Sequence, residues 1–207
     1  MKNDVKLLRY AGGDISHAEA AWASTGGMTD EKRQRIPKLL MRLGTSVPRH
    51  TVPFEHSWLQ FQIIADVATH IQFLKHRTFS INTESARYKE YEEDQFYSPS
   101  DWNEDSLGAL DAMSYATSAL YHRLITDLTP TLGRSRAKES ARYALTYARK
   151  LTFIVSCNFH SFAHFQMLRN SEHAQLEIRE LAAKMLQLVR EETNNSFEGS
   201  LRAWSLI

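Results

Sequence analysis

Apolar side chains recur every three or four residues in the second half of this chain, and this spacing constrains the fold most. One stripe lies within residues 107–128 and a second lies within residues 174–188. Such spacing places the apolar side chains on one face of an α-helix. The polar residues on the opposite face of the second segment are Glu180, Lys184, Gln187 and Glu191. The sequence therefore predicts long helices that pack through apolar faces.

Strand signals are fewer and shorter. Apolar and polar residues partly alternate over residues 58–64, which predicts a strand. We expect a helix over residues 66–74 and a second strand over residues 85–91. A further helix is predicted over residues 133–149, continuing toward Cys157.

The N-terminal part is expected to be rich in loops as far as Thr29 and Asp30, which can cap a helix. Pro37 should kink or divide that helix. No strand–glycine loop–helix unit is visible in the sequence, so a Rossmann fold is not indicated. The prediction is an α+β fold with a small antiparallel sheet and long packed helices, in a single domain over residues 1–207.

Composition narrows the possible partners. The chain has 207 residues, is 43% hydrophobic and carries a formal net charge of +1, whereas nucleic-acid-binding proteins are usually more basic. Its apolar runs are far shorter than the roughly 20 residues that cross a bilayer. One cysteine, Cys157, fits a reducing compartment. We expect a cytoplasmic protein without a nucleic-acid or membrane partner.

Two local patterns were considered for metal or nucleophile chemistry. His160 and His164 lie four residues apart on one helix face, but the glutamate of the metalloprotease helix is missing. They are interpreted as polar rings that line a pocket or pack on aromatics, and no metal site is predicted. Cys157 lies in an apolar run, which favours a buried core thiol over a nucleophile.

Basic side chains gather in the segment Lys75-His76-Arg77, which Ser85 and Arg87 follow. Arginine offers a planar fork that binds phosphate or carboxylate oxygens in pairs. Arginines from distant parts of the chain could therefore converge on one phosphorylated ligand. Spacing alone favours the simpler interpretation, in which each arginine pairs with a nearby carboxylate on the surface.

Four segments in the same order resemble the flavin-dependent thymidylate synthases. His76-Arg77, seven residues and Ser85 resemble the family's signature of Arg-His-Arg, seven residues and Ser. The other three matching segments are Pro53-Phe54-Glu55-His56 with His50 upstream, Glu139-Ser140-Ala141-Arg142, and Leu168-Arg169 with residues 173–179. The similarity spans residues 14–205.

The resemblance implies an α+β subunit in a homotetramer, with active sites where subunits meet. It implies FAD as cofactor, NADPH as reductant and methylenetetrahydrofolate as carbon donor. The substrate would be a uridine nucleotide monophosphate, dUMP, which is methylated at C5 to dTMP. No enzyme cysteine attacks the base in this family, so the protein supplies orientation and electrostatics.

Site residues follow from the resemblance by position. Arg169 should face the pyrimidine and stabilise negative charge on the ring, and Ser85 should position the substrate. The residues expected around the nucleotide are Gln72, Ser85, Arg87, Arg142 and Arg169. The residues expected around FAD are Ser24, His50, Lys75, His76, Arg77, Asn158, His160 and His164.

The sequence departs from the family pattern at two positions near the residues expected around FAD and the nucleotide. Lys75 stands where the signature has its first arginine, and Thr83 stands where the family has a glutamate. These changes leave open a relative that methylates UMP, or both UMP and dUMP, for a modified-nucleoside pathway. A nucleotide-binding protein that kept the scaffold without catalysis is the other alternative.

Overall fold

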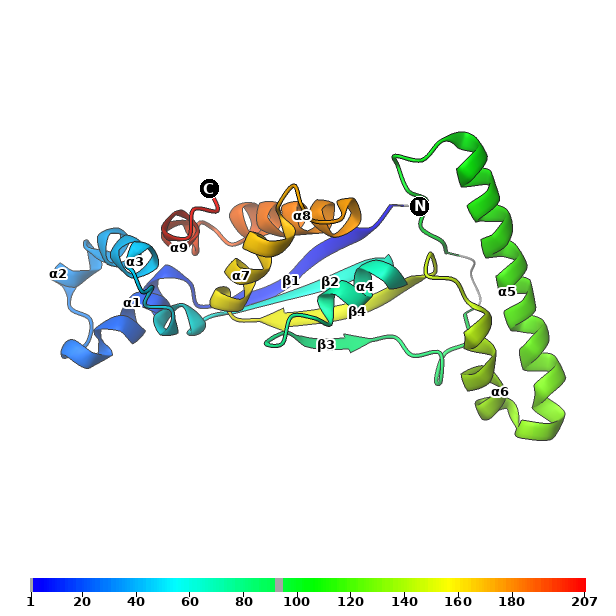
Figure 1. Cartoon of the computed structure of the whole chain (residues 1–207). Coiled ribbons are helices and arrows are strands. Elements are labelled where there is room, and N and C mark those ends of the chain that lie inside the picture. The colour runs from blue at the N-terminus through cyan, green and yellow to red at the C-terminus, as the bar shows by residue number, and fades with distance from the viewer. Residues whose placement is uncertain (1, 92–94) are drawn as a thin grey trace. The chain divides into compact units, whose positions relative to one another are not determined.

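The computed structural model describes residues 2–91 and 95–207, which fold around a four-stranded sheet (Figure 1). The strands are β1 (Asp4–Ala11), β2 (Trp58–Asp66), β3 (Ser80–Thr83) and β4 (Lys150–Cys157). Their order across the sheet is β1-β2-β4-β3, and neighbouring strands run antiparallel. The predicted α+β class with a small antiparallel sheet is confirmed.

Nine α-helices occur in the part of the chain that the structure describes. They are α1 (Asp14–Trp22), α2 (Asp30–Arg33), α3 (Ile36–Thr45), α4 (Val67–Phe73), α5 (Glu104–Leu132), α6 (Arg134–Ala141), α7 (Phe159–Arg169), α8 (Leu176–Glu192) and α9 (Glu198–Ala203). None of these described helices combines the length and the apolar character needed to pass through a bilayer.

The described residues divide into two compact units. The first unit comprises the described residues of 1–4, 63–73 and 82–153, and the second comprises Val5–Gln62, Leu74–Ile81 and Ile154–Ile207. Strands β2 and β4 contribute residues to both units.

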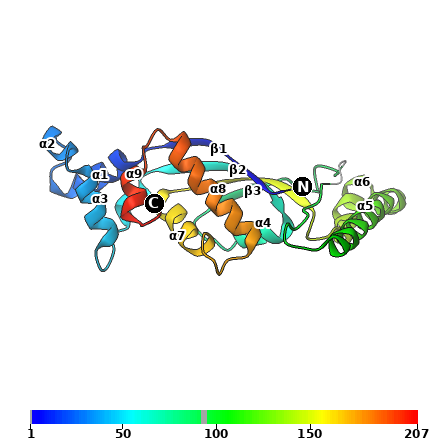
Figure 2. The ribbon, with the colours of Figure 1, turned by 90° about the horizontal axis from the view of Figure 1, so that it is seen from above.

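In the second unit, α7 and α8 cover one face of the sheet (Figure 2). Phe61 of β2 stacks on Phe162 of α7, with ring centroids 6.0 Å apart. Helix α8 buries Ile178, Leu181 and Met185. Its polar face is exposed, so the predicted amphipathic helix is confirmed.

The N-terminal part of the chain is regular structure rather than the expected loops. Strand β1 pairs with β2, and α1 packs on α3 and α9. Asp14, the first residue of α1, accepts hydrogen bonds from the backbone N–H groups of Gly199 and Ser200 at 2.6 and 2.9 Å. These contacts come from residues far along the chain, which local sequence patterns do not reveal.

Helix α2 begins where the sequence predicted. The side chain of Thr29 caps it by accepting a bond from the N–H of Lys32. Pro37 lies in the first turn of α3, where its missing N–H has no helical partner to lose. The predicted helix is therefore divided into α2 and α3.

In the first unit, α5 packs on α6 over a small core of aromatic and aliphatic residues. The predicted helix over residues 107–128 is confirmed as part of α5. The face that is buried, however, carries Ser114, Ser118, Tyr121 and Ile125. Met113 of the apolar stripe is 58% exposed.

Two predicted elements of the first unit are wrong. Residues 85–91 form a turn, because the Ser85 carbonyl accepts bonds from the N–H groups of Tyr88 and Lys89 at 3.0 Å. The strand is β3, which lies just before this turn. The helix that starts near Gly133 ends at Ala141, and residues 150–157 form β4 instead of continuing it. Pairing with β2 and β3 favours the strand there.

Candidate functional site

A pocket of about 850 Å³ in the second unit, here called the His50 pocket, lies beside α1, α3 and the segment 46–53. Ser24 and His50 both line it, so the structure brings these two predicted residues together. Arg42 and Arg49 add positive charge, and none of the described lining residues is acidic. The pocket is large enough for a cofactor and favours an anionic one.

Arg49, Trp204 and His160 form a cluster in the same unit. The Arg49 guanidinium lies 4.9 Å from the centroid of the Trp204 ring. His160 lies 5.4 Å from that ring, and its Nδ1 is 3.1 Å from Oε1 of Glu55. The Trp204 Nε1–H is buried without a hydrogen-bond partner among the described residues. Trp204 thereby links Arg49, at the pocket, with His160 on α7.

His76 lies in an aromatic cage and contacts a cation. Its ring centroid is 5.3 Å from that of Phe79 and 4.9 Å from that of Phe165. Arg169 donates a hydrogen bond from Nε to Nε2 of His76 at 3.2 Å. Because arginine only donates, Nε2 accepts and the proton of the neutral ring is on Nδ1.

Burial lowers the pKa of His76 to about 4, and the charges of Arg169 and His164 lower it further in the same direction. The imidazole is therefore neutral at pH 7. A neutral ring can orient the Arg169 guanidinium without repelling it. The structure thus places two residues predicted for FAD, His76 and His164, near Arg169, which was predicted for the nucleotide.

The segment around His76 is tied to the start of α7. Thr78 donates a hydrogen bond from its hydroxyl to Oγ of Ser161 at 2.7 Å. Asn158 caps α7, since its Oδ1 accepts a bond from the Ser161 N–H at 2.8 Å. Lys75 and Arg77 are exposed, and no side-chain ion pair is found for either within residues 2–91 and 95–207. Both charges are available to an anion.

A second pocket, of about 320 Å³, lies in the first unit and is here called the Ser85 pocket. Ser85 and Arg142 line it together with Tyr91 and Arg149. The buried Arg149 guanidinium lies 4.3 Å from the Tyr91 ring centroid. Burial raises the pKa of Tyr91 to about 12, so its hydroxyl remains a proton donor at neutral pH.

Three residues predicted for the nucleotide, Gln72, Arg87 and Arg169, do not line the Ser85 pocket. Arg87 lies on the surface and donates from Nε to Oε1 of Glu139 at 2.6 Å. Gln72 is half-buried on α4. Arg169 belongs to the second unit, whereas the other four predicted nucleotide residues belong to the first.

Sequence reasoning missed Trp204, Arg49 and Arg149. Arg49 directly precedes His50, so its adjacency to a predicted site residue was an available signal. Arg149 is one of few basic residues beside a β-branched run, which hints at burial. Trp204 gave no signal, because its contacts come from residues 49, 54 and 160.

Neither a metal site nor a reactive thiol is found among the described residues. Among residues 2–91 and 95–207, no three His, Cys, Asp or Glu side chains gather to hold a metal ion. Burial raises the pKa of the Cys157 thiol, which therefore stays protonated.

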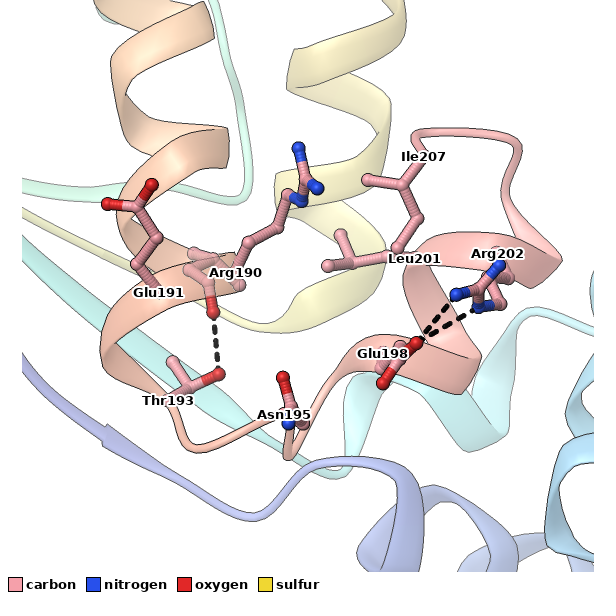
Figure 3. A pocket seen from close by; sticks show the side chains of 9 residues that line it. Arg190, Glu191, Thr193, Asn195, Glu198, Leu201, Arg202 and Ile207 are labelled. Carbon is pink, nitrogen blue, oxygen red and sulfur yellow. Dashed lines mark hydrogen bonds and ion pairs between the residues drawn. The ribbon is translucent and has the colours of Figure 1, made fainter.

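A smaller pocket of about 250 Å³ lies where α8 leads into α9 (Figure 3). There Glu198 pairs with Arg202 at 2.6 Å, and the Thr193 hydroxyl donates to the Val189 carbonyl. No predicted site residue lines this pocket.

Comparison with known proteins gives consistent matches over most of the chain. The family model described as thymidylate synthase complementing protein matches residues 6–193. A flavin-dependent thymidylate synthase of Pseudothermotoga lettingae is 31% identical over 210 residues, covering 96% of this chain and 90% of that protein. Enzymes of the same name from Wolbachia pipientis and Ehrlichia ruminantium are each 30% identical, covering 69% and 67% of their own lengths and 90% and 91% of this chain.

Proposed function

Because this chain belongs to the family of thymidylate synthase complementing proteins, we propose that it methylates C5 of a uridylate with the help of a flavin. The substrate is dUMP and the product dTMP. Methylenetetrahydrofolate supplies the carbon and NADPH the reducing equivalents. The uncharged His76 that accepts a bond from Arg169 carries the proposal, since both residues fall in motifs shared with the family.

The residues of the second unit fit FAD. The His50 pocket has the volume of a cofactor site, two arginines for a diphosphate and no described acidic lining residue. Ser24 and His50 would hold the cofactor there. Lys75, His76, Arg77, Asn158, His160 and His164 are proposed as further contacts. When bound, the flavin supplies the redox chemistry.

Residues of this chain bind and polarise the substrate in the proposal. Ser85 and Arg142 share one pocket, which supports a phosphate or sugar contact by Arg142 and a positioning contact by Ser85. Arg87 and Gln72 are proposed at its margin. The Arg169 guanidinium donates to the neutral ring of His76, and its positive charge can stabilise negative charge on the pyrimidine.

A thiolate has no part in this scheme. Cys157 is the only cysteine, it is buried in β4, and burial keeps its thiol protonated. Activation of C5 by a cysteine adduct would need an exposed thiol of lowered pKa. The reaction proposed here therefore proceeds without a covalent bond between Cys157 and the base.

The proposal includes self-association into a homotetramer with active sites at the subunit interfaces. Helix α5 supports this, because Met113 is 58% exposed and the exposed Ala109, Ala112 and Ala116 lie on the same side of the helix. Exposed apolar side chains on one long helix are typical of a surface that another subunit covers.

UMP, alone or together with dUMP, is the alternative substrate. Thr83, which stands where the family has a glutamate, shares a hydrogen bond of 2.8 Å between its Oγ1 and Nε2 of His70. The neighbouring Glu84 accepts a bond from the Thr152 N–H. The replacement of this glutamate by Thr83, which contacts His70, supports an altered sugar preference.

Tritium release from C5-labelled dUMP and UMP, measured in parallel with FAD, NADPH and methylenetetrahydrofolate, tests both versions. Release from dUMP alone would establish the first and exclude the alternative. Release from UMP would establish the alternative. A purified protein that stays colourless after incubation with FAD, and releases no tritium from either nucleotide, would refute the proposed function.

A further inference from the structure

A second groove in the second unit carries two cations, Arg35 and Lys38, that belong neither to the family motifs nor to the proposed flavin site. It has a volume of about 830 Å³ and is lined by α3 and Trp22. Its basic residues are Arg35, Lys38 and Arg42, and no acidic residue occurs in its described lining. It shares Trp22, Leu39 and Arg42 with the His50 pocket. We call it the α3 groove.

The three cations of the α3 groove differ from other arginines of this chain. Arg33 pairs with Asp30 at 3.8 Å, and Arg202 pairs with Glu198 at 2.6 Å. For Arg35, Lys38 and Arg42, by contrast, no side-chain ion pair is described anywhere in residues 2–91 and 95–207. All three are exposed, so their charges point to an external anion.

Their placement also opposes helix stability. Arg35 is the N-cap of α3 and Lys38 lies in its first turn, which contains no acidic residue. Cations are unfavourable at this end of the helix dipole, and like charges four residues apart, as in Lys38 and Arg42, repel. Such an arrangement is expected where a ligand, rather than folding, requires the charges.

The spacing of the charges indicates the shape of the ligand. Arg35, Lys38 and Arg42 share one helix face and span about 10 Å at a rise of 1.5 Å per residue. A single phosphate would engage one or two adjacent cations. A row of separated cations, beside the exposed Met41 and the half-buried Trp22, instead suits an extended chain with repeated carboxylates and methylene groups.

We propose that the α3 groove binds the poly-γ-glutamate tail of the folate co-substrate. This inference rests on the proposed function, which places methylenetetrahydrofolate beside the flavin. Because the groove shares three residues with the His50 pocket, a folate ring near the flavin would direct its glutamate tail along α3.

The kinetic test compares methylenetetrahydrofolate with one and with five glutamates. For the wild-type enzyme, KM should fall about fivefold with the longer tail, as expected for two exposed charge contacts. The double variant Arg35→Gln/Lys38→Gln, whose two residues line the α3 groove but not the His50 pocket, should lose this dependence and keep its FAD. Arg9→Gln, an exposed change on β1 of the same unit that touches neither pocket, should retain it.

Three results would overturn the inference. They are equal KM values for both folates in the wild type, loss of FAD from the double variant, and a raised KM for NADPH with an unchanged folate tail effect. The second would assign the groove to the flavin, and the third to the pyridine nucleotide.

A binding measurement separates this inference from the proposed function. Equilibrium binding of folic acid pentaglutamate to the FAD-loaded protein needs no turnover. Tail-dependent binding that Arg35→Gln/Lys38→Gln abolishes would support the inference even if no tritium were released from a uridylate. Tritium release together with equal binding of folic acid mono- and pentaglutamate would refute this inference and leave the proposed function intact.

Discussion

Burial keeps two imidazoles of this protein uncharged. His17 lies between the hydroxyls of Ser200 and Ser57, with 2.8 Å to each, and burial lowers its pKa to about 3. Burial likewise lowers the pKa of His76 to about 4. The ordinary histidine pKa is near 6.5. Below that pH these two histidines therefore bind protons in the unfolded chain but stay unprotonated in the folded one.

The free energy of unfolding should therefore fall as the pH falls from about 6.5 to about 4. For His17 the slope is roughly 1.4 kcal/mol per pH unit within this window. Urea unfolding at pH 7.5, 6 and 5 measures the slope. His17→Gln, which keeps polar atoms but cannot titrate, should reduce it; an unchanged slope would contradict the assignment to His17.

Arg169 should matter for turnover rather than for cofactor binding. Arg169→Ala removes a cation proposed to face the pyrimidine, and about a 100-fold loss of turnover is expected with FAD still bound. The pKa of His76 should rise in this variant, because a neighbouring positive charge is gone. The acidic limb of the pH–rate profile should shift upward accordingly.

Arg190→Ala is the matched control for Arg169→Ala, since it removes an exposed arginine of α8. Its turnover and flavin absorbance should equal those of the wild type. Near-normal turnover of Arg169→Ala would remove the role proposed for Arg169, whatever the behaviour of the control.

At the residue scale, motifs predicted more than periodicity did. The expectation that His160 and His164 share one helix face is met, because both lie in α7. The strand expected from Ser85 was wrong, because the Ser85 hydroxyl accepts the Arg87 N–H at 3.3 Å and stabilises a turn. That local bond competes with strand pairing, and the apolar pattern alone does not register it.

The contact between α3 and α9 depends on the absence of one side chain. A Cβ at Gly44 would lie 2.5 Å from the carbonyl oxygen of Ala203. Gly44→Ala should therefore lower the free energy of unfolding by roughly 1–3 kcal/mol, since the two helices would have to separate. Thermal and urea unfolding measure the loss.

Gly108→Ala is the control for this element. Gly108 lies in α5, and a Cβ there would meet nothing within 4 Å. Alanine favours the helix over glycine, so a gain of about 0.5–1 kcal/mol is expected. Equal effects of the two substitutions would show that close helix packing at Gly44 is not responsible.

At the element scale, prediction was accurate where an element has one solvent-exposed and one buried face. Helix α8 meets this condition, and its buried residues follow the predicted stripe. For α5 the pattern gave the helix but not the buried face, because Ser114 and Ser118 pack inward while Met113 is exposed. Side chains that pair only with distant segments leave no local period in the sequence.

For the whole molecule, the exposed side of α5 is the feature to test. Met113→Glu places a charge on the surface proposed to meet another subunit, so the proposed tetramer should dissociate into smaller species. Size-exclusion chromatography with light scattering measures the mass. Gln187→Glu on the polar face of α8 adds the same charge and should leave the mass unchanged; dissociation in both variants would point to a general charge effect.

The order of the strands was beyond the reach of the sequence. β4 lies between β2 and β3, although 66 residues separate the end of β3 from the start of β4. Ser85 and Arg149, which line one pocket, are likewise far apart in the sequence. Only the shared family motifs could associate such remote residues before the fold was known.

The single thiol of this protein has a practical consequence. Cys157 is 4% exposed at the end of β4, so a reagent such as iodoacetamide can reach it only when the sheet around it opens. The alkylation rate of Cys157 therefore measures how often the sheet around it opens. One cysteine per chain makes the readout unambiguous by intact mass, in a purified sample or in a living cell, without any introduced label.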